Sequence, residues 1–244
     1  MKENCTTLYP NNTVAQAVSE YADRRSLSLP ARLTEYHTWV LQTQEQAHFT
    51  ISTLEARFLT WIAHLVVLEI GAFVGFSVAV WADAVGPNGC VTGLERYPDY
   101  VKLARDQLKS RGWDNAQILE GDASEILNNH APPQPYDIIF IDAQKSQYPE
   151  YLQSILENSK PGNATRLLRP GGLIIGDNAL RSALVVDQSE ANPATKTVPQ
   201  ESVNWNWSDL DRLDEFNGAL HSNPRLETFL LPVFDGLGMA RLLD

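Results

Sequence analysis

The sequence has few cysteines and a deficit of positive charge. Its two cysteines, Cys5 and Cys90, have neither the spacing of a zinc site nor the number that a disulfide framework needs, and this usage fits a reducing compartment. The 19 basic residues stand against 30 acidic ones, which gives a formal net charge of −11. Because nonspecific nucleic-acid affinity comes mainly from basic side chains, this balance disfavours a nucleic-acid partner and favours small-molecule chemistry.

Long apolar runs are also missing. The most apolar stretch, 61–70, contains His64 and Glu69 and is shorter than a bilayer span. The first residues, MKENCTTLYPNNTVAQ, lack the apolar core of a signal peptide. We therefore expect a cytoplasmic protein with no membrane partner. A chain of 244 residues, 43% hydrophobic and 20% charged, is expected to form one globular domain over 1–244.

Hydrophobic periodicity predicts helices at the beginning of the chain. Residues 12–65 show the helical period, which Pro30 interrupts. Two apolar stripes lie on either side of this proline: Val14, Ala17, Val18 and Tyr21, then Leu33, Tyr36, His37, Val40 and Leu41. Ser52 and Glu55 have the spacing of a capping box, so a helix is expected to start near Ser52. We interpret residues 1–64 as a helical cover on a core formed by 65–244.

Within this core, short apolar runs alternate with segments of helix length. Strands are predicted at 66–70, 90–95, 117–120, 136–141 and 172–175, and helices near 76–85, 99–111, 124–129 and 148–158. Such alternation is typical of a doubly wound, mostly parallel sheet in an α/β fold. A helix over 208–222 and strands over 225–232 and 238–243 predict an antiparallel hairpin at the sheet edge. The polar stretch 180–207 is too long for an ordinary connection, so it is either a functional or a disordered loop.

A glycine turn follows the first predicted strand, in Glu69-Ile-Gly-Ala-Phe-Val-Gly-Phe-Ser77. Gly71 lets the backbone turn tightly against a ligand, and a helix beginning near Phe76 offers free N–H groups and a positive dipole end to an anion. Without a G-x-G-x-x-G pattern, the turn does not encode the pyrophosphate site of a dinucleotide enzyme. It therefore indicates either another nucleotide-like cofactor or a turn with a purely structural role.

Acidic residues end the first two strands. Glu69 is placed to accept a hydrogen bond from a cofactor's amino group, or else to bond backbone amides at the strand end. Glu95 comes 26 residues later, near the distance at which an acidic residue binds ribose hydroxyls. Asp122 and Ala123, after the third strand, are placed to meet an adenine ring. Each signal alone is weak, and together with the glycine turn they favour an adenosine-type cofactor.

Two further strand ends carry oxygen-rich side chains: Asp142, and the pair Asp177 and Asn178. Successive strands of a doubly wound sheet are often neighbours, which would bring these three residues together. Two carboxylates and one amide oxygen, without cysteine or histidine, suit Mg²⁺, and also Mn²⁺ or Ca²⁺, better than zinc. The alternative is structural, in which Asp142 caps a helix and Asp177 and Asn178 form a turn.

Lys145 lies three residues after Asp142. Beside a bound cation and partly removed from water, its ammonium group would have a lowered pKa and would act as a general base. The plain alternative is an exposed lysine at a helix start. The first interpretation makes Asp142 and Lys145 the candidate catalytic residues.

Taken together, these segments resemble the metal-dependent O-methyltransferases of the caffeoyl-CoA and catechol type, which use S-adenosylmethionine (SAM). The similarity runs from about Ser52 to the C-terminus, in motifs that keep the family's order: STLEARFL (52–59), EIGAFVGFS (69–77), IDAQK (141–145), GG (171–172), DN (177–178) and LPVFDG (231–236). The resemblance implies a seven-stranded, Rossmann-like SAM methyltransferase sheet. It also implies methyl transfer to a hydroxyl of a small catechol-like acceptor, and a homodimer.

The family pattern implies a role for each motif residue. SAM would lie over Glu69, Gly71, Ala72, Ser77, Glu95, Asp122, Ala123 and Asp142. A divalent metal would be held by Asp142, Asp177 and Asn178 and would bind both oxygens of a vicinal diol, which lowers the pKa of one hydroxyl. Lys145 matches the lysine proposed as the base, and the ionised oxygen would attack the SAM methyl group in line.

Some positions depart from the family pattern. Gln144 replaces a usual second aspartate, Val74 a frequent threonine, and Ser182 an asparagine that touches substrate in plant members. The loop that holds Trp205 and Trp207 is expected to face the substrate, unless these tryptophans anchor the core. Two other functions stay open: a SAM methyltransferase that acts on nitrogen or carbon without metal, and a catalytically silent SAM-fold binding protein.

Overall fold

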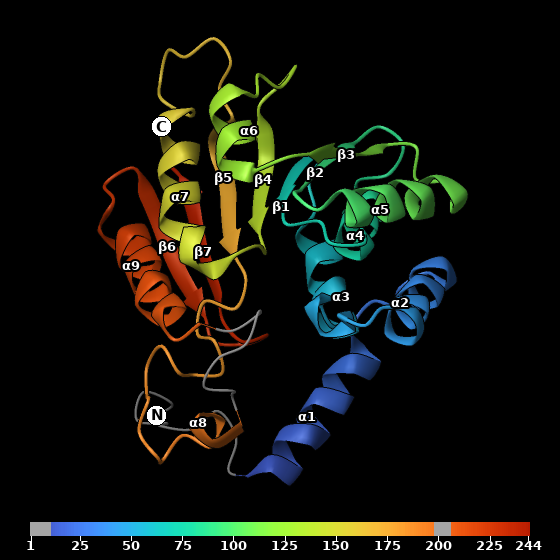
Figure 1. Ribbon diagram of the computed structural model, residues 1–244, viewed down its shortest axis with the longest axis vertical. Coiled ribbons are helices and arrows are strands. Elements are labelled where there is room, and N and C mark those ends of the chain that lie inside the picture. Colours follow the sequence, from blue (N-terminus) through green and yellow to red (C-terminus); the bar gives the residue numbers. More distant parts are fainter. Residues whose placement is uncertain (1–10, 198–205) are drawn as a thin grey trace.

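A seven-stranded mixed sheet forms the centre of the structure (Figure 1). The computed structural model describes residues 11–197 and 206–244. In sheet order the strands are β3 (Ala116–Glu120), β2 (Cys90–Glu95), β1 (Val66–Ile70), β4 (Tyr136–Ile141), β5 (Leu168–Gly176), β7 (Leu237–Leu242) and β6 (Leu226–Leu231). Strands β1 to β5 are parallel, and β7 runs antiparallel to β5 and β6. The predicted doubly wound sheet with an antiparallel C-terminal hairpin is confirmed.

The central strands are apolar on both faces. In β1, Leu68 and Ile70 belong to one apolar cluster, whereas Val67 belongs to the cluster on the opposite face. Burial on both faces explains why the sequence shows continuous apolar runs here instead of alternation. Strand β5 begins at Leu168, before the predicted start at 172. Pro170 and the two following glycines conceal this start, because such residues ordinarily mark a turn.

Two layers of helices cover the sheet. On one face lie α2 (Ala31–Thr43), α3 (Thr53–Ile62), α4 (Phe76–Val85) and α5 (Pro98–Ser110). On the other face lie α6 (Ala123–Asn129), α7 (Tyr148–Glu157) and α9 (Ser208–Ser222). Helix α4 is buried on nearly every side, as its apolar sequence requires. In the described part of the chain, no helix combines the length and the hydropathy needed to cross a membrane.

The N-terminal helices differ in how they pack. Helix α2 buries one side against α4, with Leu33 and Val40 in the core. Helix α1 (Asn12–Arg25) extends away from both layers (Figure 1), and its apolar residues Val14 and Tyr21 are 37% and 57% exposed. The second predicted apolar stripe therefore covers the core except at Leu41, which is 54% exposed, whereas the first is largely exposed.

The turn of the C-terminal hairpin contacts the segment that leaves β5. Phe234, Asp235 and Gly236 all have positive φ, at 55°, 67° and 90°. Ala179 N donates to the Gly236 carbonyl at 2.8 Å, and Leu180 N donates to the Asp235 carbonyl at 3.0 Å. The described part of the 180–207 stretch continues through turns and the short helix α8 (Ala194–Thr197), while Trp205 lies outside the described residues.

Candidate active site at the carboxyl ends of the strands

The strand order reverses between β1 and β4, and the candidate site lies at the carboxyl ends of these strands. The register of β1, β4 and β5 places Gly71, Asp142 and Asp177 level with one another. Asp142 N donates to the Ile70 carbonyl, and Asp177 N to the Ile141 carbonyl, both at 2.9 Å. Open α/β sheets bind their ligands at such a reversal, so the fold brings the predicted cofactor and metal residues to one place.

Lys145 is buried beside Asp142. It begins the short 3₁₀ helix η3 (Lys145–Gln147), and its residue is only 6% exposed. Lys145 Nζ donates to Asp142 Oδ1 at 3.0 Å and to the Tyr148 hydroxyl at 2.6 Å. The alternative of an exposed lysine at a helix start is therefore wrong, and the amine lies inside the site.

Asp177 and Asn178 form a turn directly after β5. Asp177 Oδ1 accepts a hydrogen bond from Asn178 N at 2.7 Å, and Asn178 has a left-handed φ of 54°, which asparagine tolerates. Burial, reinforced by the negative charge of Asp142, raises the pKa of the Asp177 carboxyl to about 8. The turn at Asp177 and Asn178, which was predicted as the alternative to a metal site, is present. It holds the buried Asp177 carboxyl group next to Asp142.

Glu55 is a residue of this site that the sequence did not predict. The expected capping box is half formed: Ser52 Oγ accepts from Glu55 N at 3.1 Å, but Glu55 Oε1 is buried and has no hydrogen-bond partner in the described part of the chain, and the carboxyl group interacts with that of Asp177. Burial and the charges of Asp177 and Asp142 raise the pKa of Glu55 to about 10. The Glu55 side chain therefore points away from the start of α3 and toward the two aspartates.

The site combines three carboxyl groups with one ammonium group, from Glu55, Asp142, Asp177 and Lys145. If all four were ionised, negative charge would be in excess, which a divalent cation is suited to neutralise. Across residues 11–197 and 206–244, however, no group of three or more histidine, cysteine, aspartate or glutamate side chains is arranged to hold a metal ion. The predicted donor set for a hard cation, Asp142, Asp177 and the amide oxygen of Asn178, therefore stays a prediction.

The glycine turn touches the end of β4. Gly71 has a φ of 96°, and both Gly71 N and Ala72 N donate to the Leu94 carbonyl, at 3.0 and 2.9 Å. A Cβ atom on Gly71 would lie 2.1 Å from the Asp142 carbonyl oxygen. Only glycine fits here, because both the backbone angle and the close approach exclude a side chain.

Glu69 is fully buried below this turn. Its Oε1 accepts a hydrogen bond from the Ser77 hydroxyl, whereas Oε2 makes no hydrogen bond of ordinary length among the described residues, although the buried Trp81 indole lies near enough to lower the pKa of the carboxyl. Burial raises the pKa of the Glu69 carboxyl well above its ordinary value. The predicted alternative, a carboxylate bonded to backbone amides, is not what is observed. The unpaired oxygen instead fits an ammonium group, such as that of the SAM amino acid moiety.

Glu95, in contrast, is bonded to the backbone. Its Oε2 accepts from Phe73 N at 2.8 Å and its Oε1 from Tyr97 N at 2.9 Å, and burial raises its pKa. Asp122 caps α6, since its Oδ1 accepts from Ser124 N at 2.9 Å. Both carboxylates thus have structural partners at the strand ends, and their contacts with ribose and adenine stay predictions.

The three positions that depart from the family pattern have distinct surroundings. Gln144 Oε1 accepts from Arg96 at 3.4 Å, which links the ends of β4 and β2. Val74 is fully buried. Ser182 N donates to the Asp235 carboxylate, which ties the loop after β5 to the hairpin turn.

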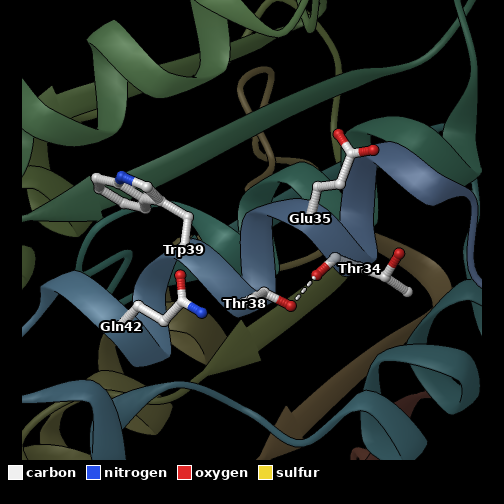
Figure 2. A pocket seen from close by; sticks show the side chains of 5 residues that line it. All are labelled: Thr34, Glu35, Thr38, Trp39 and Gln42. Carbon is white, nitrogen blue, oxygen red and sulfur yellow. Dashed lines mark hydrogen bonds between the residues drawn. The ribbon is translucent and has the colours of Figure 1, made fainter.

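A surface hollow of about 280 Å³ lies elsewhere, on helix α2 (Figure 2). It is lined by Thr34, Glu35, Thr38, Trp39 and Gln42. The Thr38 hydroxyl is bonded to the Thr34 carbonyl of its own helix at 2.8 Å. No pair of an acid and a base lines this hollow, so we do not assign the chemistry to it.

The chain is similar to known O-methyltransferases, which agrees with the polar residues found at the strand ends. The family described as O-methyltransferase matches residues 24–243. The O-methyltransferase ankF of Aspergillus thermomutatus is 28% identical over 240 residues, which are 96% of this chain and 95% of that protein. A catechol O-methyltransferase of Niastella koreensis is 30% identical over 203 residues, or 78% and 81% of the two chains. The caffeoyl-CoA O-methyltransferase 2 of Populus trichocarpa is 29% identical over 218 residues, or 86% and 78%.

Solved structures agree with the sequence relatives. The methyltransferase PaMTH1 of Podospora anserina, solved with S-adenosylhomocysteine (SAH) bound, superposes with a TM-score of 0.80 at 26% identity. The match covers 98% of this chain and 99% of PaMTH1. The fold is therefore that of a SAM methyltransferase, as predicted. Family, relatives and strand-end architecture together identify the chain as a member of the O-methyltransferase family, a SAM-dependent enzyme of the caffeoyl-CoA and catechol type.

Proposed function

We propose that this enzyme methylates one hydroxyl of a small catechol-like acceptor with the help of a divalent metal. The observation that carries the proposal is the cluster of Glu55, Asp142 and Asp177 around the single amine of Lys145, one strand away from the glycine turn. Such a cluster places an excess of carboxyl oxygens where a cation and a diol would meet the methyl donor. The catechol and caffeoyl-CoA relatives support the same class of acceptor.

In this proposal SAM lies across the ends of β1, β2 and β3. The unpaired Glu69 Oε2 receives the SAM ammonium group, and Ser77 orients Glu69 through the Oε1 atom. The residues assigned to SAM are Glu69, Gly71, Ala72, Ser77, Glu95, Asp122, Ala123 and Asp142. Glu95 would bind the ribose hydroxyls through the lone pairs that its two backbone N–H donors leave free.

The metal would be held by Asp142, Asp177 and Asn178, with Mg²⁺ preferred and Mn²⁺ or Ca²⁺ possible as substitutes. When bound, the cation would supply Lewis acidity that favours the ionised form of the acceptor hydroxyl. Lys145 would take the proton of that hydroxyl at Nζ. Asp142 holds this amine at 3.0 Å, which keeps the base at the edge of the metal site.

The first experiment measures methyl transfer from SAM to catechols, phenols and amines, with Mg²⁺ and with EDTA. We expect turnover of vicinal diols, its loss in EDTA and its recovery when Mg²⁺ is restored. Turnover that persists in EDTA would contradict the metal assignment and favour metal-independent transfer. SAM binding without turnover of any acceptor in the panel would favour the silent binding protein.

We also propose that the enzyme is a homodimer joined through α1. The exposed apolar residues Val14 and Tyr21 give this helix a surface for a second copy. Arg57 holds α1 to the body, because it donates to the Asp23 carbonyl at 2.9 Å and pairs with the Asp23 carboxylate. Light scattering at micromolar concentration tests the proposal, and a monomer would contradict it.

A further inference from the structure

Tyr148 is a fully buried residue at the start of α7 whose hydroxyl lies inside the candidate site. Three atoms surround its oxygen: Lys145 Nζ at 2.6 Å, the Ile141 carbonyl at 2.8 Å and the Asp177 carbonyl at 3.1 Å. These partners come from η3, from the end of β4 and from the residue after β5. One phenol therefore joins the two strand ends that carry the predicted metal ligands to the predicted base.

When Lys145 is an ammonium group, which has no lone pair, the donors and acceptors around this hydroxyl admit one arrangement. A phenol has a single proton, and a carbonyl oxygen can only accept. The Tyr148 proton must therefore go to the carbonyls of Ile141 and Asp177, and its lone pair must accept an N–H from Lys145. The hydroxyl thus serves as a fixed acceptor for the amine, anchored to the backbone of both strands.

This acceptor determines how the amine can be oriented. The nitrogen of a lysine side chain has three tetrahedral positions besides its bond to Cε, and acceptors fix which way these positions point. Lys145 has two acceptors, Asp142 Oδ1 at 3.0 Å and the Tyr148 oxygen at 2.6 Å, and each uses one N–H. The third tetrahedral position is thereby fixed, and it points away from both acceptors.

We propose that Tyr148 is a positioning residue that fixes the place and orientation of Lys145 Nζ beside the acceptor hydroxyl, through the hydrogen bond between its own hydroxyl and Nζ. The inference rests on the proposed function, in which Lys145 takes that proton. Without the phenol oxygen, the amine keeps only Asp142 as an acceptor and can rotate about its Cε–Nζ bond. The fraction of amines aimed at the acceptor would then fall, which lowers kcat more than it changes KM.

Packing makes Tyr148→Phe a clean substitution. The Tyr148 ring meets Phe216 edge to face at a centroid distance of 5.2 Å. Phe216 fits there because Gly176 has no side chain: a Cβ atom at that position would lie 2.6 Å from the Phe216 ring. A phenylalanine at 148 keeps this ring contact and removes only the oxygen.

The experiment is a double-mutant cycle of Tyr148→Phe and Lys145→Met. Rates are measured in single turnovers with enzyme in excess, because this format makes slow methyl transfer measurable. We expect Tyr148→Phe to lower the rate about 10- to 100-fold, with KM for the acceptor and the SAM dissociation constant within twofold. In the Lys145→Met background the same change should lower the rate by less than twofold, because the group on which it acts is gone. If the rate losses of the two single variants multiply in the double variant, Tyr148 has a merely structural role and the inference is overturned.

A matched control separates this role from the loss of any buried hydroxyl. Tyr136, at the opposite end of β4, is 2% exposed and its hydroxyl is hydrogen bonded to His130 Nε2 at 2.8 Å. Tyr136→Phe should leave the rate within twofold of the wild type. If Lys145→Met keeps full turnover, the base assignment of the proposed function fails. If Lys145→Met loses turnover and Tyr148→Phe does not, only the inference about Tyr148 fails.

Discussion

Replacing Glu55 with glutamine is expected to stabilise the metal-free enzyme against unfolding, and this gain in stability should increase with pH. Burial and the nearby carboxyl groups of Asp177 and Asp142 raise the pKa of Glu55 from 4.5 to about 10. In the folded state the carboxyl therefore keeps a proton that the unfolded chain releases. The stability linked to this proton is fully present below about pH 4.5 and is lost as the pH rises toward the folded-state pKa.

The size of the effect follows from the pKa values. One pKa unit corresponds to about 1.4 kcal/mol, so the interval from 4.5 to pH 7 costs the folded enzyme about 3 kcal/mol. Glutamine has a similar shape and does not titrate, so Glu55→Gln removes this cost. For a protein of this size, about 3 kcal/mol corresponds to a rise in Tm of about 6 to 12 °C.

Thermal unfolding in EDTA at pH 5, 7 and 8 measures the effect. The Tm difference between Glu55→Gln and the wild type should be small at pH 5 and should grow at each higher pH. Glu125→Gln, which changes an exposed carboxyl on α6, is the matched control and should have no such trend. A Glu55→Gln enzyme no more stable than the wild type at pH 8, or a difference independent of pH, would refute the reasoning.

Three further substitutions test other parts of the site. Asp142→Ala should abolish metal-dependent turnover, whereas SAM binding, measured by calorimetry, should weaken only modestly because the seven other residues assigned to SAM remain; unchanged turnover would remove Asp142 from the metal site. Glu95→Ala should weaken SAM binding about tenfold or more, and an unaltered dissociation constant would exclude Glu95 from the cofactor site. Gly71→Ala should give little folded protein, as judged by circular dichroism, because its Cβ atom would lie 2.1 Å from the Asp142 carbonyl; a folded, active Gly71→Ala enzyme would contradict the close approach.

Much of the fold could be predicted because the signals that specify it are local. Apolar runs that end in Gly71, Glu95 or Asp142 mark strands whose carboxyl ends carry polar residues. The reversal between β1 and β4 then brings those ends together without further information. The start of β5 could not be placed, because Pro170 and the glycines after it read as a turn although β5 continues through them.

Sequence reasoning missed Glu55 and Tyr148 because a local structural role already accounts for each residue. Glu55 has the spacing of a capping box, and only the folded chain brings it next to Asp177, far away in the sequence. Tyr148 follows the apolar period of α7, and nothing local distinguishes a core ring from one whose hydroxyl enters the site. Both contacts depend on long-range packing, which the pattern of one segment does not encode.

Helices α2 and α3, which precede β1, also contact the candidate site at the carboxyl ends of the strands. Helix α2 reaches the glycine turn, because the buried Tyr36 hydroxyl donates to the Val74 carbonyl, and α3 brings Glu55 to the aspartates. A chain shortened to begin at Leu65 would keep every strand and lose both contacts. Protein engineers who graft this sheet, or exchange the first 64 residues of the chain with those of a relative, would therefore be altering the candidate site as well as its covering.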